Sequence, residues 1–467
     1  MKWIIYYQLV RGINLFDLAV YQYSNSDWFI SGERPVFGPH NPIWKGMPAF
    51  HTYIARLSYL LTLGKPEIHV AVYYPVRDIW ANGPDMKLII KDYDDLCRFL
   101  FNHQIDFDFI DDDILQSKET KVIANELIVG SMRYSVIILP STHWITQESI
   151  DKLIQFIEMG GNVYYLNYNA KFFANKIPKA KSLSKDEISG HIRPLVEISP
   201  NSNDTESIHV LKRTLTNAHL YFIQYEGKTK IEIMIKFFES APCYMLNFYN
   251  GQMIPIKSIE KDAKFIDIPL LFDYGDSYIF LFSYNEFSNL TEANFQKSSM
   301  LLSLPSAEWR AYRKTSFEIS KKAIITKEFH ENEPKIEIEL GSWSKWFGHS
   351  FSGEICYELS FSCDKDTAEK AKTLDLGKVE CISEVILNGK NLGIKIWSPY
   401  TYDINNLIQQ GENRLLIIVS NTLANQYIHT NWKKMWPKNK LGPYHPKALK
   451  FERDSVKGGL FGPVIIR

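Results

Sequence analysis

Cysteine, net charge and long apolar runs are all scarce in this sequence, and each shortage excludes a class of protein. The 467 residues include five cysteines, none of them in a CxxC pair or beside a histidine at metal-ligand spacing. Free thiols are therefore expected rather than a disulfide framework or a zinc site, and no metal or other cofactor is predicted. Lysine plus arginine equals aspartate plus glutamate at 53 each, so no net charge favours a nucleic-acid or membrane partner.

The first residues, MKWIIYYQLVRGINLFDLAVYQYS, are largely apolar but fit no targeting segment. Lys2, Arg11 and Asp17 interrupt the run, whereas a membrane span needs about 20 uncharged apolar residues. A signal peptide needs a small-residue cleavage site, which does not follow here. With no signal visible, the chain as it stands is expected in the cytoplasm, and a chain that had lost its leader would be periplasmic or secreted.

Residues 2–9 are predicted to form a helix that ends at Gly12, and residues 14–23 a strand. A step from helix to strand of this kind belongs inside a larger α/β body. The sequence therefore predicts that Met1 lies inside an α/β domain whose earlier elements come before it. A second helix is expected over residues 49–64, where apolar residues recur at helical spacing.

The pattern of the chain changes near residue 190. Before it, the continuous apolar runs 68–75 and 134–140 are typical of strands buried on both faces of a parallel sheet, and an amphipathic helix is expected over 147–161. After it, short segments of alternating polarity indicate a β-sandwich and then a second all-β unit. Aromatic residues reach 14%, which is typical of aromatic-rich β domains and of carbohydrate binders.

The most specific stretch lies near the C-terminus: LDLGKVECISEVILNGKNLGIKIWSPYTYDINNLIQQGENRLLIIVSNTLANQYI (374–428), closed by GGLFGPVIIR. It resembles the jelly-roll sugar-binding domain of family 2 glycoside hydrolases and the related domain that ends family 106 enzymes. The resemblance implies that Trp397, Asn421 and Asn425 line a sugar contact. The alternative is that the two asparagines cap turns and Trp397 fills the core.

The N-terminal segments MKWIIYYQLVRGINLFDLAVYQYS, RPVFGPHNPIW and YIARLSYLLTLG resemble the last strand and helix of the (β/α)8 barrel in family 106-like, α-L-rhamnosidase-like glycoside hydrolases. The rest of the barrel would then be expected upstream of Met1. The resemblance also implies a substrate pocket lined by two groups of residues: Asn14, Tyr21 and Tyr23 in the first segment, and His40, Asn41 and Trp44 in the loop. The alternative to this pocket is that Trp44 anchors the following helix and His40 bonds within its own loop.

The run YSVIILPSTHWITQESIDKLIQFIEMGGNVYYLN resembles the glutamine-amidotransferase-like domain of β-galactosidases. A working amidotransferase needs a nucleophilic cysteine at a strand-to-helix elbow, but Cys97 falls within a predicted helix, so this part is expected to be non-catalytic. The predicted fold is multidomain, α/β plus all-β. Its parts are a barrel remnant (1–66), an amidotransferase-like domain (67–185), a β-sandwich (186–304) and a galactose-binding-like jelly roll (305–467).

Glycoside hydrolysis needs two carboxyl groups beside the scissile bond, and the barrel remnant offers only Asp17, Asp27 and Glu33. We therefore expect the C-terminal portion of a rhamnosidase-like glycoside hydrolase that is inactive alone, its catalytic residues unknown. The alternative is a non-catalytic carbohydrate-binding or scaffold protein. Expected partners are carbohydrate, an upstream barrel polypeptide, or a second copy bound through residues 1–66, which would be poorly packed without one.

Overall fold

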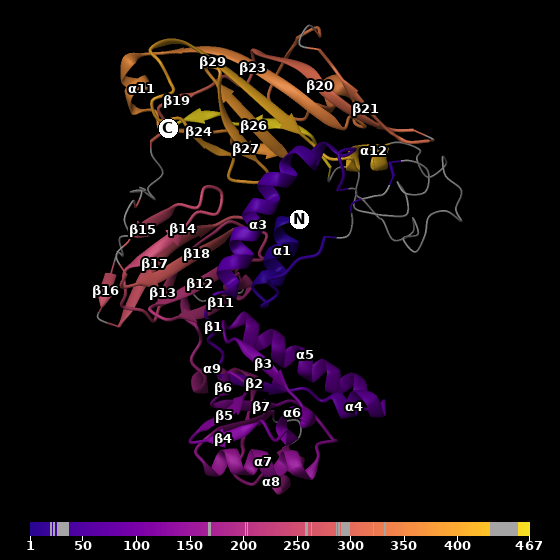
Figure 1. The fold of residues 1–467 in the computed structure, drawn as a ribbon, viewed down its shortest axis with the longest axis vertical. Helices are drawn as coiled ribbons and strands as arrows, with labels where there is room; N and C mark the ends of the chain where they lie inside the picture. Colours follow the sequence, from indigo (N-terminus) through magenta and orange to yellow (C-terminus); the bar gives the residue numbers. More distant parts are fainter. Residues whose placement is uncertain are drawn as a thin grey trace. The chain divides into compact units, whose positions relative to one another are not determined.

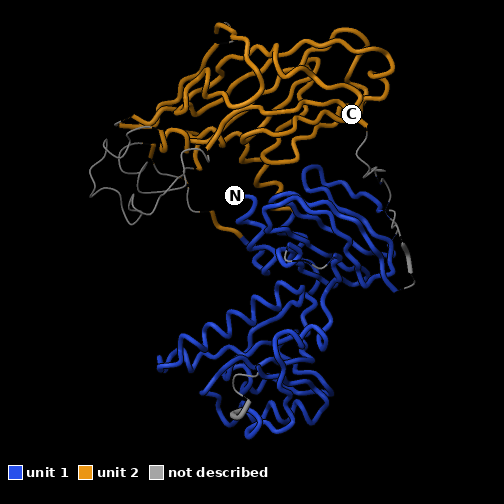
Figure 2. The backbone as a smooth tube through the Cα atoms, turned by 180° about the vertical axis from the view of Figure 1, so that it is seen from behind, with its two compact units in different colours: residues 1–15, 57–293 blue, residues 16–56, 294–467 orange. Residues whose placement is uncertain are grey.

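The computed structural model describes residues 1–18, 21, 24–25, 37–166, 170–200, 202, 204–256, 260–262, 264–285, 287, 290, 299–320, 322–330, 333–429 and 456–467. The chain forms two compact units (Figure 2). Unit 1 contains residues 1–15 and 57–293, and unit 2 contains residues 16–56 and 294–467. Helix α3 (Met47–Thr62) contributes residues to both. As expected, the chain contains both helices and strands and is rich in β-structure (Figure 1).

The first residues of unit 1 are packed more tightly than the sequence suggested. Helix α1 (Lys2–Leu9) forms as predicted, and Gly12 just after it has a positive φ of 89°. Tyr6 and Leu9 are fully buried, and the ring of Tyr6 meets that of Phe222 edge-on at 5.8 Å. The expectation that residues 1–66 would be poorly packed without a partner is therefore wrong for this helix.

The strand expected over residues 14–23 is also wrong for the part that the structure describes, because residues 13–18 and 21 lie in no strand. Ile13 and Leu15 are exposed, so these apolar side chains do not face a core. Within residues 1–66, the described elements are helices α1 and α3, the 3-10 helix η1 (Pro42–Gly46) and the short strand β1 (Lys65–Pro66).

A five-stranded parallel sheet in the order β3-β2-β7-β8-β9 lies in unit 1. Ala71 and Tyr73 of β2 join the core beneath α7, whereas Val70 and Val72 join the core beneath α5 and α9. Strands covered on both faces need the continuous apolar runs that predicted them. The strands are β2 (Val70–Tyr73), β3 (Phe107–Ile110), β7 (Val136–Leu139), β8 (Asn162–Leu166) and β9 (Lys181–Leu183).

Short helices and a small antiparallel sheet surround this parallel sheet (Figure 1). Helix α7 begins where predicted because the Thr146 side chain accepts a hydrogen bond from the Ser149 backbone N–H, which caps its first turn. The helices are α4 (Val76–Ala81), α5 (Met86–Asn102), α6 (Asp112–Gln116), α7 (Gln147–Glu158), α8 (Ala170–Lys176) and α9 (Lys185–His191). The small sheet is β4 (Lys121–Ile123), β5 (Glu126–Val129) and β6 (Met132–Tyr134).

Two antiparallel sheets complete unit 1 and enclose an aromatic core that includes Tyr221, Phe237 and Phe272. The six-stranded sheet has the order β1-β11-β12-β18-β14-β15, with β11 (Ile208–Leu215), β12 (Ala218–Tyr225), β14 (Cys243–Leu246), β15 (Met253–Ile256) and β18 (Ser277–Ser283). The four-stranded sheet has the order β10-β13-β17-β16, with β10 (Val196–Ser199), β13 (Ile231–Phe237), β16 (Glu260–Asp262) and β17 (Phe265–Phe272). The 3-10 helix η3 (Thr205–Ser207) precedes β11.

Unit 2 is built on a large antiparallel sheet in the order β21-β20-β23-β29-β26-β27, with β22 also paired to β20. Its core gathers around Trp309, Trp343 and Tyr357. These strands are β20 (Trp309–Ile319), β21 (Ile324–Glu328), β22 (Ile336–Ile338), β23 (Gly353–Cys363), β26 (Ile382–Leu387), β27 (Lys390–Lys395) and β29 (Gly411–Ser420).

A second sheet of unit 2, in the order β19-β31-β24-β28, joins the same core through Leu374, Tyr402 and Ile466. Its strands are β19 (Leu302–Ser303), β24 (Thr373–Asp375), β28 (Thr401–Asp403) and β31 (Ile465–Ile466), and a separate pair is β25 (Lys378–Glu380) with β30 (Gly459–Gly462). Short helices are α10 (Ser344–Phe347), α11 (Lys365–Lys370) and α12 (Ala424–His429). In the described ranges of the chain, no helix is both long and apolar enough to span a membrane.

Candidate functional site

The predicted contact residues near the N-terminus fall in different parts of the fold. Asn14 is half-buried in unit 1, whereas Tyr21, His40, Asn41 and Trp44 belong to unit 2. Tyr23 lies outside the described residues, as do the acidic candidates Asp27 and Glu33. Asp17 is exposed.

Tyr21 and Trp44 form an exposed aromatic pair, which we call the Tyr21–Trp44 surface. Their rings meet edge-on with centroids 5.9 Å apart, and the two side chains are 65% and 41% exposed. His40 lies in the turn just before η1, which carries Trp44, and its Nδ1 is 3.4 Å from the amide of Asn25. Burial lowers the pKa of His40 below its ordinary value, so its ring is neutral at pH 7. The exposed rings of Tyr21 and Trp44 suit contact with a sugar better than acid–base chemistry.

Asn41 has a structural role within this loop. Its Oδ1 accepts a hydrogen bond from the Ile43 backbone N–H at 3.3 Å, which caps the 3-10 helix η1. The side chain is buried. A sugar hydroxyl would have to compete with this cap for Asn41.

Trp397 lies against helix α3. Its ring is 5.0 Å from that of Tyr53 and 5.9 Å from that of Phe50, both in perpendicular arrangements. Such edge-to-face contacts stabilise packed aromatic groups. These contacts support the packing alternative for Trp397 and leave a sugar contact there a prediction.

Asn421 and Asn425 form a buried pair of amides at the end of β29. Asn421 accepts a hydrogen bond from the Gly353 N–H at 2.8 Å and donates to the carbonyl of Phe351 at 2.8 Å and to Asn425 at 3.1 Å. Asn425 donates to the carbonyl of His349 at 3.3 Å. Both amides therefore hold the chain that enters β23, and their contact with a sugar also stays a prediction.

Two carboxylates that the sequence did not single out bind one lysine in unit 2. Lys45 Nζ lies 2.6 Å from Glu354 and 3.0 Å from Glu384. Burial alone would raise the pKa of Glu354, but the charge and hydrogen bond of Lys45 and the hydroxyl of Thr315 hold that pKa below its usual value. An ionised, paired carboxylate cannot serve as the acid of a glycosidase. Because these residues are more than 300 positions apart from Lys45, no local sequence pattern could reveal the cluster.

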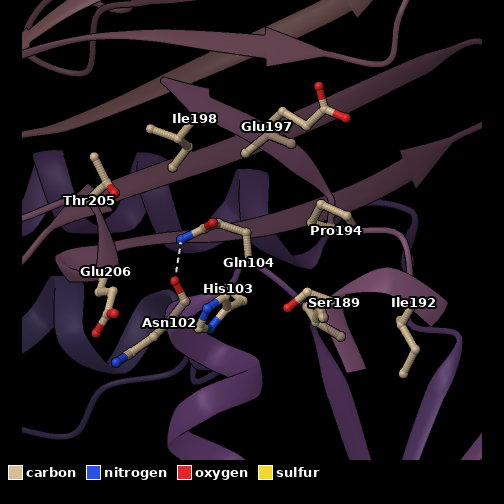
Figure 3. Close-up of a pocket in the computed structure, with 12 residues that line it drawn as sticks. Asn102, His103, Gln104, Ser189, Ile192, Pro194, Glu197, Ile198, Thr205 and Glu206 are labelled. Carbon is tan, nitrogen blue, oxygen red and sulfur yellow. Dashed lines mark hydrogen bonds between the residues drawn. The ribbon is translucent and has the colours of Figure 1, made fainter. Parts of the chain in front are cut away.

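A cavity of about 180 Å³ in unit 1 lies where the end of α5, α9 and β10 meet (Figure 3). Glu197 and Glu206 contribute to its lining, yet their carboxylates extend in opposite directions in Figure 3, and Glu197 pairs with Lys236 at 3.2 Å. The ring of His103 stacks on Phe99 with centroids 4.0 Å apart. The cavity therefore has no acid facing a base across it. Sequence reasoning missed the cavity because residues from four separate elements, α5, α9, β10 and η3, line it.

Comparison with solved structures includes a match over the full length of this chain. A rhamnosidase from Novosphingobium sp. PP1Y superposes on all of this chain with a TM-score of 0.69 and 19% sequence identity, and the match covers 45% of that rhamnosidase. At this level of identity the likeness shows a shared fold. The rhamnosidase-like fold predicted from the sequence is confirmed.

A second comparison covers less of the chain. A curated protein of Formosa agariphila named "Putative beta-glucuronidase" is 38% identical over 124 residues, which are 26% of this chain and 10% of that protein. The chain thus spans less than half the length of the proteins that it matches. It matches no protein-family profile.

Proposed function

We propose that this chain is the accessory, glycan-contacting part of a rhamnosidase-like glycoside hydrolase and does not hydrolyse glycosides by itself. The observation that carries the proposal is the fold shared over the whole chain with a rhamnosidase of which the match covers 45%. A catalytic barrel, on the same or a separate polypeptide, would supply the two carboxyl groups that hydrolysis needs.

The parts predicted from the sequence belong to the same proposal. Residues 67–185 act as a non-catalytic amidotransferase-like domain, 186–304 as a β-sandwich and 305–467 as a sugar-binding-like jelly roll. The packing of Trp397 and the hydrogen bonds of Asn421 favour a scaffold role for the last part. The second candidate function, a non-catalytic scaffold without glycan contact, rests on these bonds.

We place the glycan contact of unit 2 at the Tyr21–Trp44 surface. Its two rings are exposed, whereas the side-chain oxygen of Asn41 already accepts the hydrogen bond that caps η1. A pyranose presents an apolar face to such rings, and the neutral His40 can exchange a hydrogen bond with a hydroxyl.

The catalytic half of the proposal is tested with nitrophenyl α-L-rhamnoside, β-galactoside and β-glucuronide. The purified chain is expected to release no nitrophenol above the buffer rate from any of them. Steady turnover by the chain alone would refute this part.

The binding half is tested by saturation-transfer NMR with L-rhamnose and neutral oligosaccharides, using Trp44→Ala and, as a matched exposed control, Ile325→Ala. A weaker signal in the first variant only is the expected result. An unchanged signal in both variants would refute the Tyr21–Trp44 surface as a contact, and no signal from the wild-type chain would favour the scaffold.

A further inference from the structure

The parallel sheet of unit 1 has a topological switch point between β2 and β7. In chain order its strands are arranged 2-1-3-4-5, because β3 lies outside β2 and β7 lies on the other side of β2. In open α/β sheets of this order, ligands bind at the carboxyl ends of the two strands where the winding reverses. Here the segments at that position are residues 74–80, after β2, and residues 140–146, after β7.

A buried carboxylate fixes the two segments to each other. Asp78, on α4, is almost fully buried and accepts hydrogen bonds from the Thr142 hydroxyl at 2.5 Å and from the backbone N–H groups of His143 at 2.9 Å and Trp144 at 3.4 Å. Backbone N–H groups in such a loop would otherwise bind a phosphate or another anion. Because Asp78 takes these donors, the switch point is closed to a nucleotide phosphate.

A second buried carboxylate supports the same frame from α6. Asp112 accepts a hydrogen bond from Arg77 Nε at 2.5 Å and from the Thr146 backbone N–H at 3.3 Å. Burial alone would raise the pKa of Asp112, but hydrogen bonds, including those from Arg77 and Thr146, hold that pKa below its usual value. Both segments are therefore held in one geometry before any ligand arrives.

Two large indole rings stand exposed on this rigid frame. Trp80 is 73% exposed on α4, and Trp144 is 61% exposed on the loop after β7. Arg77 lies three positions before Trp80 and so shares its helix face, and His143 precedes Trp144. The backbone of Trp144 is joined through Asp78 to the helix that carries Trp80. Exposed indoles on a fixed frame lose little entropy when they meet a ligand.

We propose that Trp80 and Trp144, together with Arg77 on the same helix as Trp80 and His143 next to Trp144 in the chain, form a contact site for a neutral oligosaccharide at the switch point of unit 1. We call it the Trp80–Trp144 site. A pyranose alternates apolar C–H faces with hydroxyl groups, which matches indoles interspersed with polar side chains. The choice of a glycan rests on the proposed function, and the position of the site rests on unit 1 alone.

Charge and composition at the site argue against other occupants. Arg77 is already paired with Asp112 and lies 3.9 Å from the exposed Asp113, so the acidic groups outnumber the available positive charge and disfavour an anionic glycan. The core of a protein–protein interface is depleted of aspartate and glutamate, whereas the exposed Asp113 lies 3.9 Å from Arg77. A neutral sugar is compatible with the acidic groups near Arg77 and with an exposed carboxylate at the edge of the site.

The test titrates the full chain with neutral tetrasaccharides (cello-, manno-, xylo- and galactotetraose) by isothermal calorimetry and saturation-transfer NMR. Trp80→Ala and Trp144→Ala are each expected to weaken binding of at least one tetrasaccharide by about tenfold or more. Tyr274→Ala, which removes another exposed ring of unit 1, is expected to leave it unchanged. Tetragalacturonate, the anionic probe, is expected to bind more weakly than galactotetraose.

Trp44→Ala separates this proposal from the one for unit 2. If Trp44→Ala removes sugar binding and the Trp80 and Trp144 variants do not, the site at the switch point is refuted while the proposed function stands. If the wild-type chain binds none of the four tetrasaccharides, the site is also refuted. Concentration-dependent self-association that Trp80→Ala or Trp144→Ala abolishes would instead identify the indoles as a protein interface and likewise overturn the proposal.

Discussion

Replacing Lys212 by methionine is expected to destabilise unit 1 by about 3 kcal/mol at neutral pH, because it removes the ammonium shared by the buried Glu239 and the partly buried Glu67. Lys212 lies on β11 and is 7% exposed. Its Nζ is 2.9 Å from Glu67 and 3.1 Å from Glu239. Methionine fills nearly the same space as the lysine stem, so the loss is one of charge rather than of packing.

The pH dependence of this loss has a definite sign. Burial would raise the pKa of Glu67, but hydrogen bonds from His69, Thr214 and Lys212 hold it far below its usual value. For Glu239, hydrogen bonds from His219 and Tyr221 and the charge of Lys212 likewise outweigh burial and lower the pKa. A depressed carboxyl pKa contributes stability that is present above the unfolded pKa of about 4.3 and is lost as the pH falls through the folded value.

Without the ammonium of Lys212, the two carboxylates lie close together and their pKa values rise. Protonation of one of them then relieves the repulsion, so the cost of Lys212→Met is expected to shrink between pH 7.5 and pH 4.5. The measurement is urea unfolding followed by tryptophan fluorescence at both pH values. The matched control is Lys236→Met, which breaks a solvent-exposed pair with Glu197 and should cost no more than about 1 kcal/mol. Equal costs for the two variants, or a cost for Lys212→Met that does not change with pH, would refute the reasoning.

Three further predictions concern single polar groups. Lys45→Met leaves two carboxylates unpaired against the large sheet of unit 2 and should lower its stability by about 3 kcal/mol, measured by thermal unfolding. Asp78→Ala removes the acceptor of three donors at residues 142–144, which should cost about 2–4 kcal/mol and speed amide exchange there. Asn421→Ala orphans a backbone N–H and a carbonyl, and should cost about 2–3 kcal/mol in the same thermal assay.

The helices and buried strands could be predicted because their signals are local. The runs around Val136–Leu139 and Val70–Tyr73 are apolar on both faces, as a covered parallel sheet requires. The strand predicted over residues 14–23 is wrong for the described part of that segment, where the backbone joins no sheet and Leu15 packs against no core. Neither condition can be read from the local sequence.

The polar clusters could not be predicted because their partners are distant in sequence. Lys45 meets Glu354, Lys212 meets Glu67, and Asp78 meets Thr142. Each side chain alone is compatible with an exposed position, and only the fold reveals that it is buried and paired. The candidate contacts Tyr21 and Trp44 were named from the sequence, whereas the exposure of Trp80 and Trp144 above a fixed frame needed the structure.

In the loop after β7, the carboxylate of Asp78 occupies the place that an external anion would take at the backbone N–H groups. Phosphate metabolites compete for comparable loops in other α/β folds, and their cellular concentrations change with growth. A loop whose donors are permanently occupied keeps one shape through such changes. The proposed Trp80–Trp144 site above this loop would therefore keep one geometry, whichever phosphate compounds are present.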